Sequence, residues 1–255
     1  MNASDAARMT PRVVRTAAAL VIGNELLSGK VHDANVRALA SALRAVGIRL
    51  ARVVILPDDI ELLATEVRQL SANFDVVFTS GGVGPTHDDV TVEAIARAFG
   101  VDVELDPQLS DLLRSVYGER ITDAHLLMAR VPAGAVLCGA PEVEWPTPVM
   151  RNVWILPGVP DLFRLKLLTV RAWLRGPAPF VSRALFLRVE EPQLKPELDA
   201  VVLAHPTVEI GSYPKWFDPT YRTQITFDAE TPEAAEAALE ALRVRLAPSD
   251  IVRIE

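Results

Sequence analysis

The chain has 255 residues, half of them hydrophobic, and a mean hydropathy of +0.22, so it can bury a sizeable core. Its formal net charge of −7 argues against a large nucleic-acid-binding surface, although a small anionic ligand can still bind at a local site. The single cysteine, Cys138, excludes an intrachain disulfide, and no stretch reaches the roughly 20 apolar residues that span a bilayer. We therefore expect a cytoplasmic protein that binds neither nucleic acid nor membrane.

The first part of the chain alternates between apolar strands and amphipathic helices. Strands are expected at residues 15–22, 48–56 and 74–79, and helices at residues 33–46, 58–70 and 92–99. Strands that alternate with helices of this length form right-handed crossovers and a mostly parallel sheet. The strands are apolar throughout, as a sheet covered by helices on both faces requires. The fold class is therefore α/β.

The rest of the chain is less regular up to the segment that we expect to be a linker. Helices are expected from residue 106 onward, at 121–130 and at 161–174, and short strands near 135–137 and at 152–156. A strand, helix, strand, strand, helix and strand then follow, an order that predicts a small ferredoxin-like α+β domain. The expected organisation is a flexible N-terminus at 1–12, a main domain at 13–175, a linker at 176–182 and a βαββαβ domain at 183–255.

Polar turns follow the first three strands. They cover residues 23–30, 57–59 and 79–91, the last of which reads TSGGVGPTHDDVT. In α/β sheets, ligands bind at the carboxyl ends of the strands, especially at the topological switch point. If the first strand lies between the second and the third, all of these turns lie on one edge of the sheet. We expect a ligand site there.

The turn at 79–91 combines backbone freedom with negative charge. Its glycines, Gly81, Gly82 and Gly84, suggest an anion held by backbone N–H groups. Asp88 and Asp89 would repel that anion unless a cation lay between them. These residues together favour a bound anion that is bridged by a metal ion.

The turn at 23–30 is similar to a phosphate-binding P-loop but departs from it. Five residues separate Gly23 from Gly29, and Val31 follows Lys30, so no hydroxyl is available for Mg²⁺. The turn at 79–91 has no lysine at all. A divalent metal held by carboxylates would supply the missing positive charge. The candidate carboxylates are Glu25, Asp58, Asp88 and Asp89.

Several of these residues have structural alternatives. Asp58 and Glu61 have the spacing of a capping box, and Asp89 or Thr91 could cap the helix that follows. Glu25 could be a solvated loop charge. His32, His87, His125 and His205 show no zinc-binding spacing, and Trp145, Trp154 and Trp216 are read as packing residues.

Residues 81–91 resemble the molybdopterin-binding fold of the MoaB/Mog-like and CinA (competence/damage-inducible protein A) proteins and of the N-terminal domain of eukaryotic FAD synthase. The supporting matches are Gly23-x-Glu25-Leu26-Leu27-x-Gly29, Asp33-x-Asn35, Pro57-Asp58 and Leu156-Pro157-Gly158-Val159-Pro160. The small domain, with Gly211-Ser212-Tyr213-Pro214, is similar to an extension found in the CinA and FAD-synthase branch.

The resemblance implies a three-layer α/β domain with strand order 2-1-3, and a homodimer or homotrimer. In the adenylyltransferase branch, residues matching Asp58 and Asp89 serve Mg²⁺-dependent transfer of AMP onto a pterin. The CinA branch is associated with metal-dependent cleavage of nucleotide diphosphates such as ADP-ribose, and the FAD-synthase domain with FAD hydrolysis. Asn24 stands where an acidic residue is often found, which puts one metal ligand in doubt.

The leading hypothesis is a CinA-like pyrophosphatase that uses Mg²⁺, or Mn²⁺ or Co²⁺, on an ADP-ribose or FAD type of substrate. Asp88 and Asp89 would hold the metal, and Asp58, Asp89 and Glu25 would be catalytic. The expected ligand-binding residues are Gly23, Asn24, Ser80, Gly81, Gly82, Gly84, Pro85, Thr86, Pro157 and Gly158. The alternatives are molybdopterin binding or adenylylation, and a non-catalytic module that binds a nucleotide or pterin.

Overall fold

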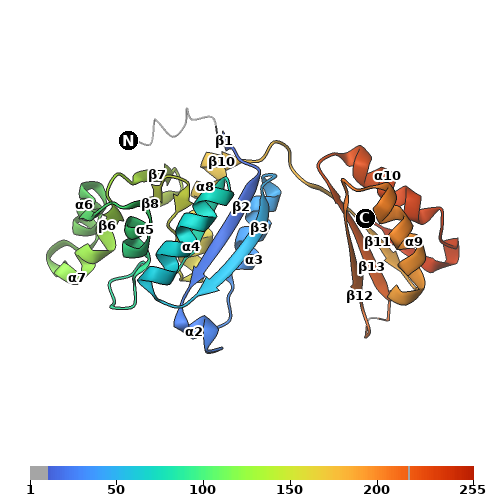
Figure 1. Cartoon of the computed structure of the whole chain (residues 1–255), viewed down its shortest axis with the longest axis horizontal. Coiled ribbons are helices and arrows are strands. Elements are labelled where there is room, and N and C mark those ends of the chain that lie inside the picture. Colours follow the sequence, from blue (N-terminus) through green and yellow to red (C-terminus); the bar gives the residue numbers. More distant parts are fainter. Residues whose placement is uncertain (1–10, 218) are drawn as a thin grey trace. The chain divides into compact units, whose positions relative to one another are not determined.

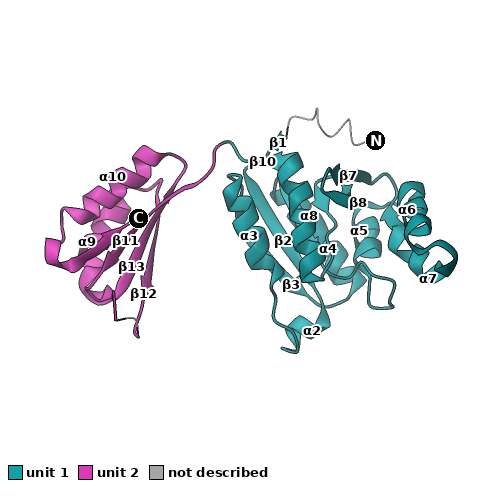
Figure 2. Cartoon of the chain, turned by 180° about the vertical axis from the view of Figure 1, so that it is seen from behind, with its two compact units in different colours: residues 1–177 teal, residues 178–255 magenta. Residues whose placement is uncertain are grey.

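The computed structural model describes residues 11–217 and 219–255, which belong to two compact units, 1–177 and 178–255 (Figure 2). Most of the segment expected to be flexible, 1–12, lies outside the described residues. Its last residue is already part of strand β1 (Arg12–Val13), which pairs in parallel with β10 (Leu174–Arg175). This pairing brings two segments from near the opposite ends of the first unit side by side.

The first unit is built on a six-stranded sheet with the order β3-β2-β4-β9-β8-β7 (Figure 1). Its strands are β3 (Arg49–Leu56), β2 (Thr16–Ile22), β4 (Val76–Ser80), β9 (Val153–Trp154), β8 (Val143–Met150) and β7 (Val136–Ala140). The pairings from β3 to β9 are parallel, and those of β8 and β7 are antiparallel. The mostly parallel sheet and the 2-1-3 order of the first three strands are confirmed.

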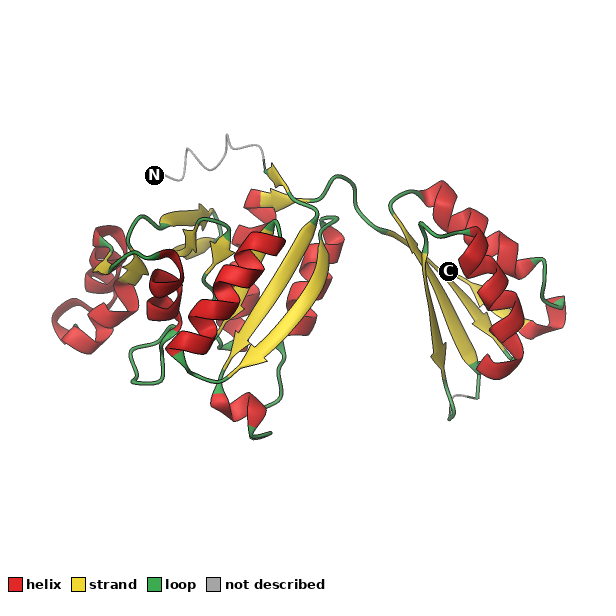
Figure 3. Ribbon diagram, in the orientation of Figure 1, coloured by secondary structure: helices red, strands yellow, loops and turns green. Residues whose placement is uncertain are grey.

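Helices cover both faces of this sheet (Figure 3). On one face α3 (Asn35–Ala45) and α8 (Pro160–Trp173) pack on a core that contains Phe163. On the other face α4 (Ile60–Asn73) and α5 (Thr91–Phe99) pack on a core that contains Leu63. Strand β2 is apolar at every position after Thr16 because both of its faces are buried. The three-layer α/β class is confirmed.

The segment between α5 and α8 differs most from expectation. The helix expected at 121–130 is wrong: only α7 (Asp123–Leu126) is α-helical, and β6 (Arg130–Pro132) pairs with β5 (Val103–Leu105). Thr122 forms a capping box with His125, which begins a new short helix. Strand β8 was not expected, because prolines usually exclude an interior strand. It contains Pro146 and Pro148.

Short elements complete this part of the first unit. They are α2 (Asn24–Leu27), α6 (Pro107–Tyr117), and 3₁₀ turns at Gly118–Arg120 and Leu127–Ala129. Asp106 caps the start of α6, and its side chain accepts a hydrogen bond from the backbone N–H of Leu109 at 2.9 Å. Leu109 and Leu113 of this helix form a small core of their own with Ala129 and Val131.

The second unit is a four-stranded antiparallel sheet, with the order β12-β13-β11-β14, that packs against two helices. Its elements are β11 (Val181–Leu187), α9 (Glu191–Ala204), β12 (Glu209–Pro214), β13 (Thr223–Ala229), α10 (Pro232–Arg243) and β14 (Ile251–Ile254), preceded by a 3₁₀ turn at Pro248–Asp250. This is the βαββαβ plan that the sequence predicts. Strand β11 already begins at Val181, within the expected linker, because Val181 pairs with Ala229.

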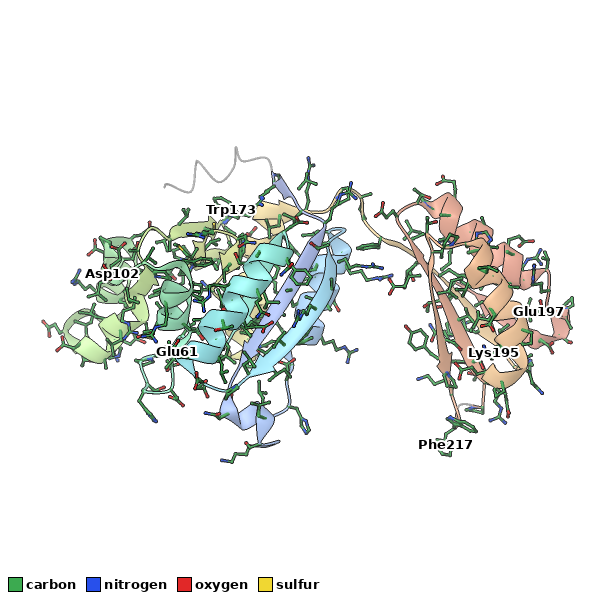
Figure 4. The ribbon with its side chains drawn as sticks, viewed as in Figure 1. Glu61, Asp102, Trp173, Lys195, Glu197 and Phe217 are labelled. Atoms are coloured by element: carbon green, nitrogen blue, oxygen red, sulfur yellow. The ribbon has the colours of Figure 1, made fainter. Side chains whose placement is uncertain are left out.

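The turn between β12 and β13 exposes aromatic side chains. Trp216 is 75% exposed, so its interpretation as a packing residue is wrong, whereas Trp154 is buried. Phe217 is fully exposed and points away from the ribbon (Figure 4). Across residues 11–217 and 219–255, no helix combines the length and the apolar character that crossing a membrane requires.

Candidate functional site

A cavity of about 780 Å³ lies at the carboxyl ends of the parallel strands of the first unit. The turns after β2, β3 and β4 all line it, together with the loop between β9 and α8. The lining residues include Gly23, Glu25, Asp58, Ser80, Gly81, Gly82, Gly84, Asp88, Asp89, Pro157 and Gly158. Asn24, Pro85 and Thr86, which were expected to bind the ligand, do not line it. The position of β2 between β3 and β4 brings these turns together.

Asp58 links two of the turns. Its Oδ2 accepts a hydrogen bond from the backbone N–H of Asn24 at 2.9 Å. The cap of α4 is Asp59 instead, whose Oδ1 accepts from the backbone N–H groups of Glu61 at 2.9 Å and Leu62 at 3.0 Å. Glu61, at this end of α4 (Figure 4), pairs with Arg97. The capping interpretation of Asp58 is therefore wrong, and its carboxylate lies in the cavity wall.

Asp88 and Asp89 converge on the hydroxyl of Thr86. Thr86 Oγ1 lies 2.6 Å from Asp88 Oδ1 and 2.5 Å from Asp89 Oδ2, and the backbone N–H of Thr86 donates to Asp89 Oδ2 at 2.8 Å. The hydrogen bond from Thr86 holds the pKa of Asp88 below its usual value. Because one hydroxyl has one proton, it donates to only one of the carboxylates at a time. The turn therefore keeps two carboxylates close together.

Neither aspartate caps the helix that follows. The residue before α5 is Val90, which makes no side-chain cap. Thr91, the first residue of the helix, donates from Oγ1 to the carbonyl oxygen of Gly81 at 2.8 Å. Both capping alternatives for this turn are therefore wrong. Asp89 instead contacts Thr86 within the turn and lines the cavity.

The glycines let the turn pass close to two other segments. Gly81 has a φ of +107°, and a Cβ there would overlap the carbonyl oxygen of Ile22 at the end of β2. A Cβ at Gly158 would lie 3.2 Å from the Cα of Gly81. Glycine is required where backbones approach this closely. The turn after β4 is therefore held between β2 and the loop after β9.

Three backbone N–H groups of this turn are available to an anion. The N–H of Gly81 donates to the carbonyl oxygen of Leu156 at 3.3 Å, so this group, which we expected to bind the diphosphate, is already occupied. Within the part of the chain that the structure describes, the N–H groups of Gly82, Val83 and Gly84 have no hydrogen-bond partner. Consecutive free N–H groups form a nest that binds anions.

Asn35 fixes two of the loops that line the cavity. It is 4% exposed, and its Nδ2 donates to Ser80 Oγ at 2.9 Å and to the carbonyl oxygen of Gly158 at 2.8 Å. It therefore joins the end of β4 to the loop before α8. The sequence identified Asn35 only as part of a motif match; a buried amide at the start of a helix is the signal of such a role.

The carboxylates fit a metal ion that is shared with a substrate. Over residues 11–217 and 219–255, no group of three or more His, Cys, Asp or Glu side chains could hold a metal ion by itself. Mg²⁺ is usually bound through one or two carboxylates, with water and substrate phosphates as the remaining ligands. Asp88 and Asp89, beside the free N–H groups, match that requirement. The side chain of His87 is 98% exposed and lies outside the cavity lining.

The other half of the cavity was not predicted from the sequence. It is lined by Leu113 and Tyr117 of α6, by Trp145 of β8, and by Lys166 of α8. Lys166 Nζ donates to the carbonyl oxygens of Trp145 at 2.5 Å and Pro146 at 3.0 Å. Burial lowers the pKa of Lys166 to about 7. The sequence feature that could have indicated the burial of Lys166 is its position between Phe163 and Leu167, on the apolar side of α8.

Residues 18–173 match the family described as a probable molybdopterin binding domain, and residues 179–255 match the middle domain of FAD synthase. The first match covers more than half of the chain. The chain belongs to the molybdopterin-binding-domain family. The family resemblance inferred from the turn at 79–91 is thereby confirmed.

Named relatives are similar to this chain over most of its length. The chain is 30% identical over 275 residues to a probable FAD synthase of Caenorhabditis elegans, covering 93% of this chain and 51% of that protein. It is 32% identical over 241 residues to a CinA-like protein of Myxococcus xanthus, covering 88% and 57%. It therefore spans about half the length of both relatives. The crystal structure of CinA from Thermoplasma acidophilum superposes with a TM-score of 0.55 at 30% identity, covering 60% of this chain and 94% of that chain.

Proposed function

We propose that this protein cleaves the diphosphate bond of a nucleotide such as ADP-ribose or FAD with the help of a divalent metal ion. One observation carries the proposal: the free N–H groups of residues 82–84 lie in the same cavity wall as Asp88 and Asp89. N–H groups alone would suit a simple anion binder, and carboxylates alone would repel a phosphate. A diphosphate with a metal ion satisfies both.

The residues of the cavity then have separate roles. The N–H groups of Gly82, Val83 and Gly84 bind the diphosphate oxygens, and Asp88 and Asp89 would hold the metal ion. When bound, the metal supplies stabilisation of the negative charge that develops on the phosphate oxygens. The cavity places this charge next to fixed N–H dipoles, which need no reorganisation during the reaction.

Glu25 is our candidate for activating water. It lines the cavity and has no resolved hydrogen-bond partner for its carboxylate among the described residues, whereas one oxygen of Asp58 accepts from Asn24. The water oxygen attacks one phosphorus, the bond from that phosphorus to the bridging oxygen breaks, and the water proton passes to the carboxylate. The products of ADP-ribose are AMP and ribose 5-phosphate, and those of FAD are AMP and FMN.

A second candidate function is binding or adenylylation of molybdopterin. The description of the matching family favours it, because that family is named for a pterin ligand. The match of residues 179–255 to a domain of FAD synthase favours the nucleotide instead. The dimer or trimer implied by the family resemblance stays a prediction.

Release of AMP tests the proposed function. The full chain is incubated with ADP-ribose or FAD and with Mg²⁺, Mn²⁺ or Co²⁺, and AMP is followed by chromatography. Asp89→Asn should lower the rate by about 10²–10³ if charge stabilisation dominates. Asp59→Asn is the matched control, because it removes the same charge outside the cavity and still caps α4. Tight nucleotide binding without AMP release under any metal would replace the hydrolase with a binding module.

A further inference from the structure

Lys166 lies on the face of α8 that lines the cavity. Leu162, Leu165 and Lys166 have the i, i+3 and i+4 spacing that places residues on one side of a helix, and all three line the cavity. Lys166 is only 7% exposed, so its amine is shielded from bulk water but borders a space that a small molecule can enter. The mechanism proposed above gives this amine no role.

Two backbone carbonyl groups orient the amine. Nζ donates to the carbonyl oxygens of Trp145 at 2.5 Å and Pro146 at 3.0 Å. A neutral amine has two N–H groups and one lone pair, so these hydrogen bonds use both of its N–H groups. Within residues 11–217 and 219–255, Nζ has no other hydrogen-bond partner and no carboxylate partner. The lone pair is therefore left for a ligand.

The surroundings of Lys166 favour the neutral form of this amine. Leu113, Tyr117 and Trp145 line the same part of the cavity, and burial lowers the pKa of Lys166 from its ordinary value of 10.5 to about 7. A lysine amine that is deprotonated near neutral pH is a nucleophile, and buried lysines of this kind react with carbonyl compounds. An exposed lysine stays protonated at the same pH.

We propose that Lys166 captures an aldehyde in the cavity as a reversible imine, and that this aldehyde has an aromatic or apolar body. The lone pair of Nζ attacks the carbonyl carbon and forms a C–N bond, and both hydrogens of the amine leave with the carbonyl oxygen as water. No oxidant or reductant takes part. Leu113, Tyr117 and Trp145 provide the apolar surface on which the body of the aldehyde packs. The capture goes beyond the proposed function, because it needs neither a metal ion nor the turn at 79–91.

Reductive trapping in the full chain tests this role. The protein is incubated at neutral pH with pyridoxal 5′-phosphate, an aromatic aldehyde, and with cyanoborohydride, which reduces an imine to a stable secondary amine. Phosphate buffer competes with the phosphate of the probe for general anion sites. Peptide mass spectrometry compares Lys166 with the exposed lysines of the same chain, Lys30, Lys195 and Lys215. Lys166 should be labelled at least about 10-fold faster than each of them. Equal or slower labelling of Lys166 would overturn the proposal.

Unfolding and substitution show whether the folded cavity is responsible. In urea, Lys166 should be labelled at the rate of the other lysines, because the unfolded chain restores its ordinary pKa. An advantage that persists in urea would come from the local sequence and would overturn the cavity site.

Variants of α8 assign the adduct to one amine. Lys166→Met should abolish the fast adduct, whereas Arg171→Met, which removes an exposed charge from the same helix, should keep it. A fast adduct that remains in Lys166→Met would also overturn the proposal. Because the trap contains neither metal nor nucleotide, a missing adduct leaves the pyrophosphatase standing, and a missing release of AMP leaves the imine standing.

Discussion

The carboxylate of Asp58 accepts a hydrogen bond from the backbone N–H of Asn24, with 2.9 Å between Oδ2 and N. These residues are 34 positions apart: Asp58 lies in the loop after β3, and Asn24 is the first residue of α2, which follows β2. Asp58 therefore fixes the segment that carries Glu25, the carboxylate we propose to activate water. Its neighbour Asp59 has a different task, because it caps α4.

Replacing each of these aspartates by alanine should distinguish the positioning role of Asp58 from the capping role of Asp59. Asp59→Ala removes the cap and should lower the free energy of unfolding by about 1 kcal/mol, with little effect on AMP release. Asp58→Ala frees the Asn24 loop and should lower AMP release more than it lowers stability. Urea unfolding and AMP release are measured for both variants. The opposite pattern would show that Asp58 is a structural residue.

The proposed metal-holding role of Asp88 and Asp89 predicts a specific pattern among asparagine variants. Asparagine keeps an acceptor oxygen for Thr86 but loses the charge against a divalent ion. In the presence of Mg²⁺, each single variant should bind ADP less tightly, while the melting temperature changes by only a few degrees. The double variant should add little, because residues that hold one ion act as a unit. Normal binding of ADP by both single variants would exclude the metal role.

Gly82→Ala and Gly100→Ala should differ although both glycines have the same backbone strain. Their φ values are +65° and +67°, so alanine is unfavourable at both. A Cβ at Gly82 would overlap Thr91 Oγ1, whereas a Cβ at Gly100 has no atom within 4 Å. Gly82→Ala should therefore cost about 1–3 kcal/mol more in urea unfolding and also weaken ADP binding. Equal costs would show that the turn after β4 has room to move.

The stability of the protein should depend on pH through Lys166. Its pKa is about 7 in the folded protein, against an ordinary value of 10.5. Between these values the unfolded chain holds a proton that the folded chain has released, so the free energy of unfolding rises with pH. The slope approaches about 1.4 kcal/mol per pH unit. Below both values the lysine is charged in both states, and the full cost of its burial remains.

Lys166→Met isolates this contribution. Urea unfolding of the variant from about pH 7 to about pH 10 should lack the rise that the wild-type protein shows. Arg171→Met should keep it, because that side chain is exposed. If wild-type protein and Lys166→Met have parallel profiles, the amine of Lys166 is solvated in the folded state.

Limited proteolysis should separate the two units. The boundary lies between Pro177 and Ala178, in a segment with no secondary structure before Val181. Because each unit has its own core, cleavage near this boundary should leave a stable fragment of residues 1–177. Mass spectrometry identifies the fragment. First cleavage inside either core would contradict the division.

The parts of the fold that the sequence predicted are those with local hydrophobic patterns. The alternation of strands and helices up to α5 fixed the parallel sheet, and the polar turns then followed from the topology. Strand β8 was missed because Pro146 and Pro148 exclude an interior strand by local rules. The structure pairs it with β7 in an antiparallel arrangement, from Val149 opposite Val136 to Val143 opposite Ala140.

The candidate site was likewise predicted only where local sequence patterns indicate the structure. The sequence offered Asp58 as a possible cap of the helix, but only backbone geometry shows that the adjacent Asp59 caps it. Lys166 was missed for a related reason: a lysine within an amphipathic helix is usually solvated at its tip. Its burial depends on β8, the strand that the sequence did not predict.

Asn35 also has a kinetic consequence. Because its amide joins Ser80 to Gly158 through hydrogen bonds within the protein, the loops after β4 and β9 need no ordering step when a ligand arrives. Ligands that enter a preformed cavity associate at similar rates, so differences in affinity appear mainly as differences in residence time. Cutting this connection with Asn35→Ala would slow association for every ligand alike, whichever ring or phosphate it carries.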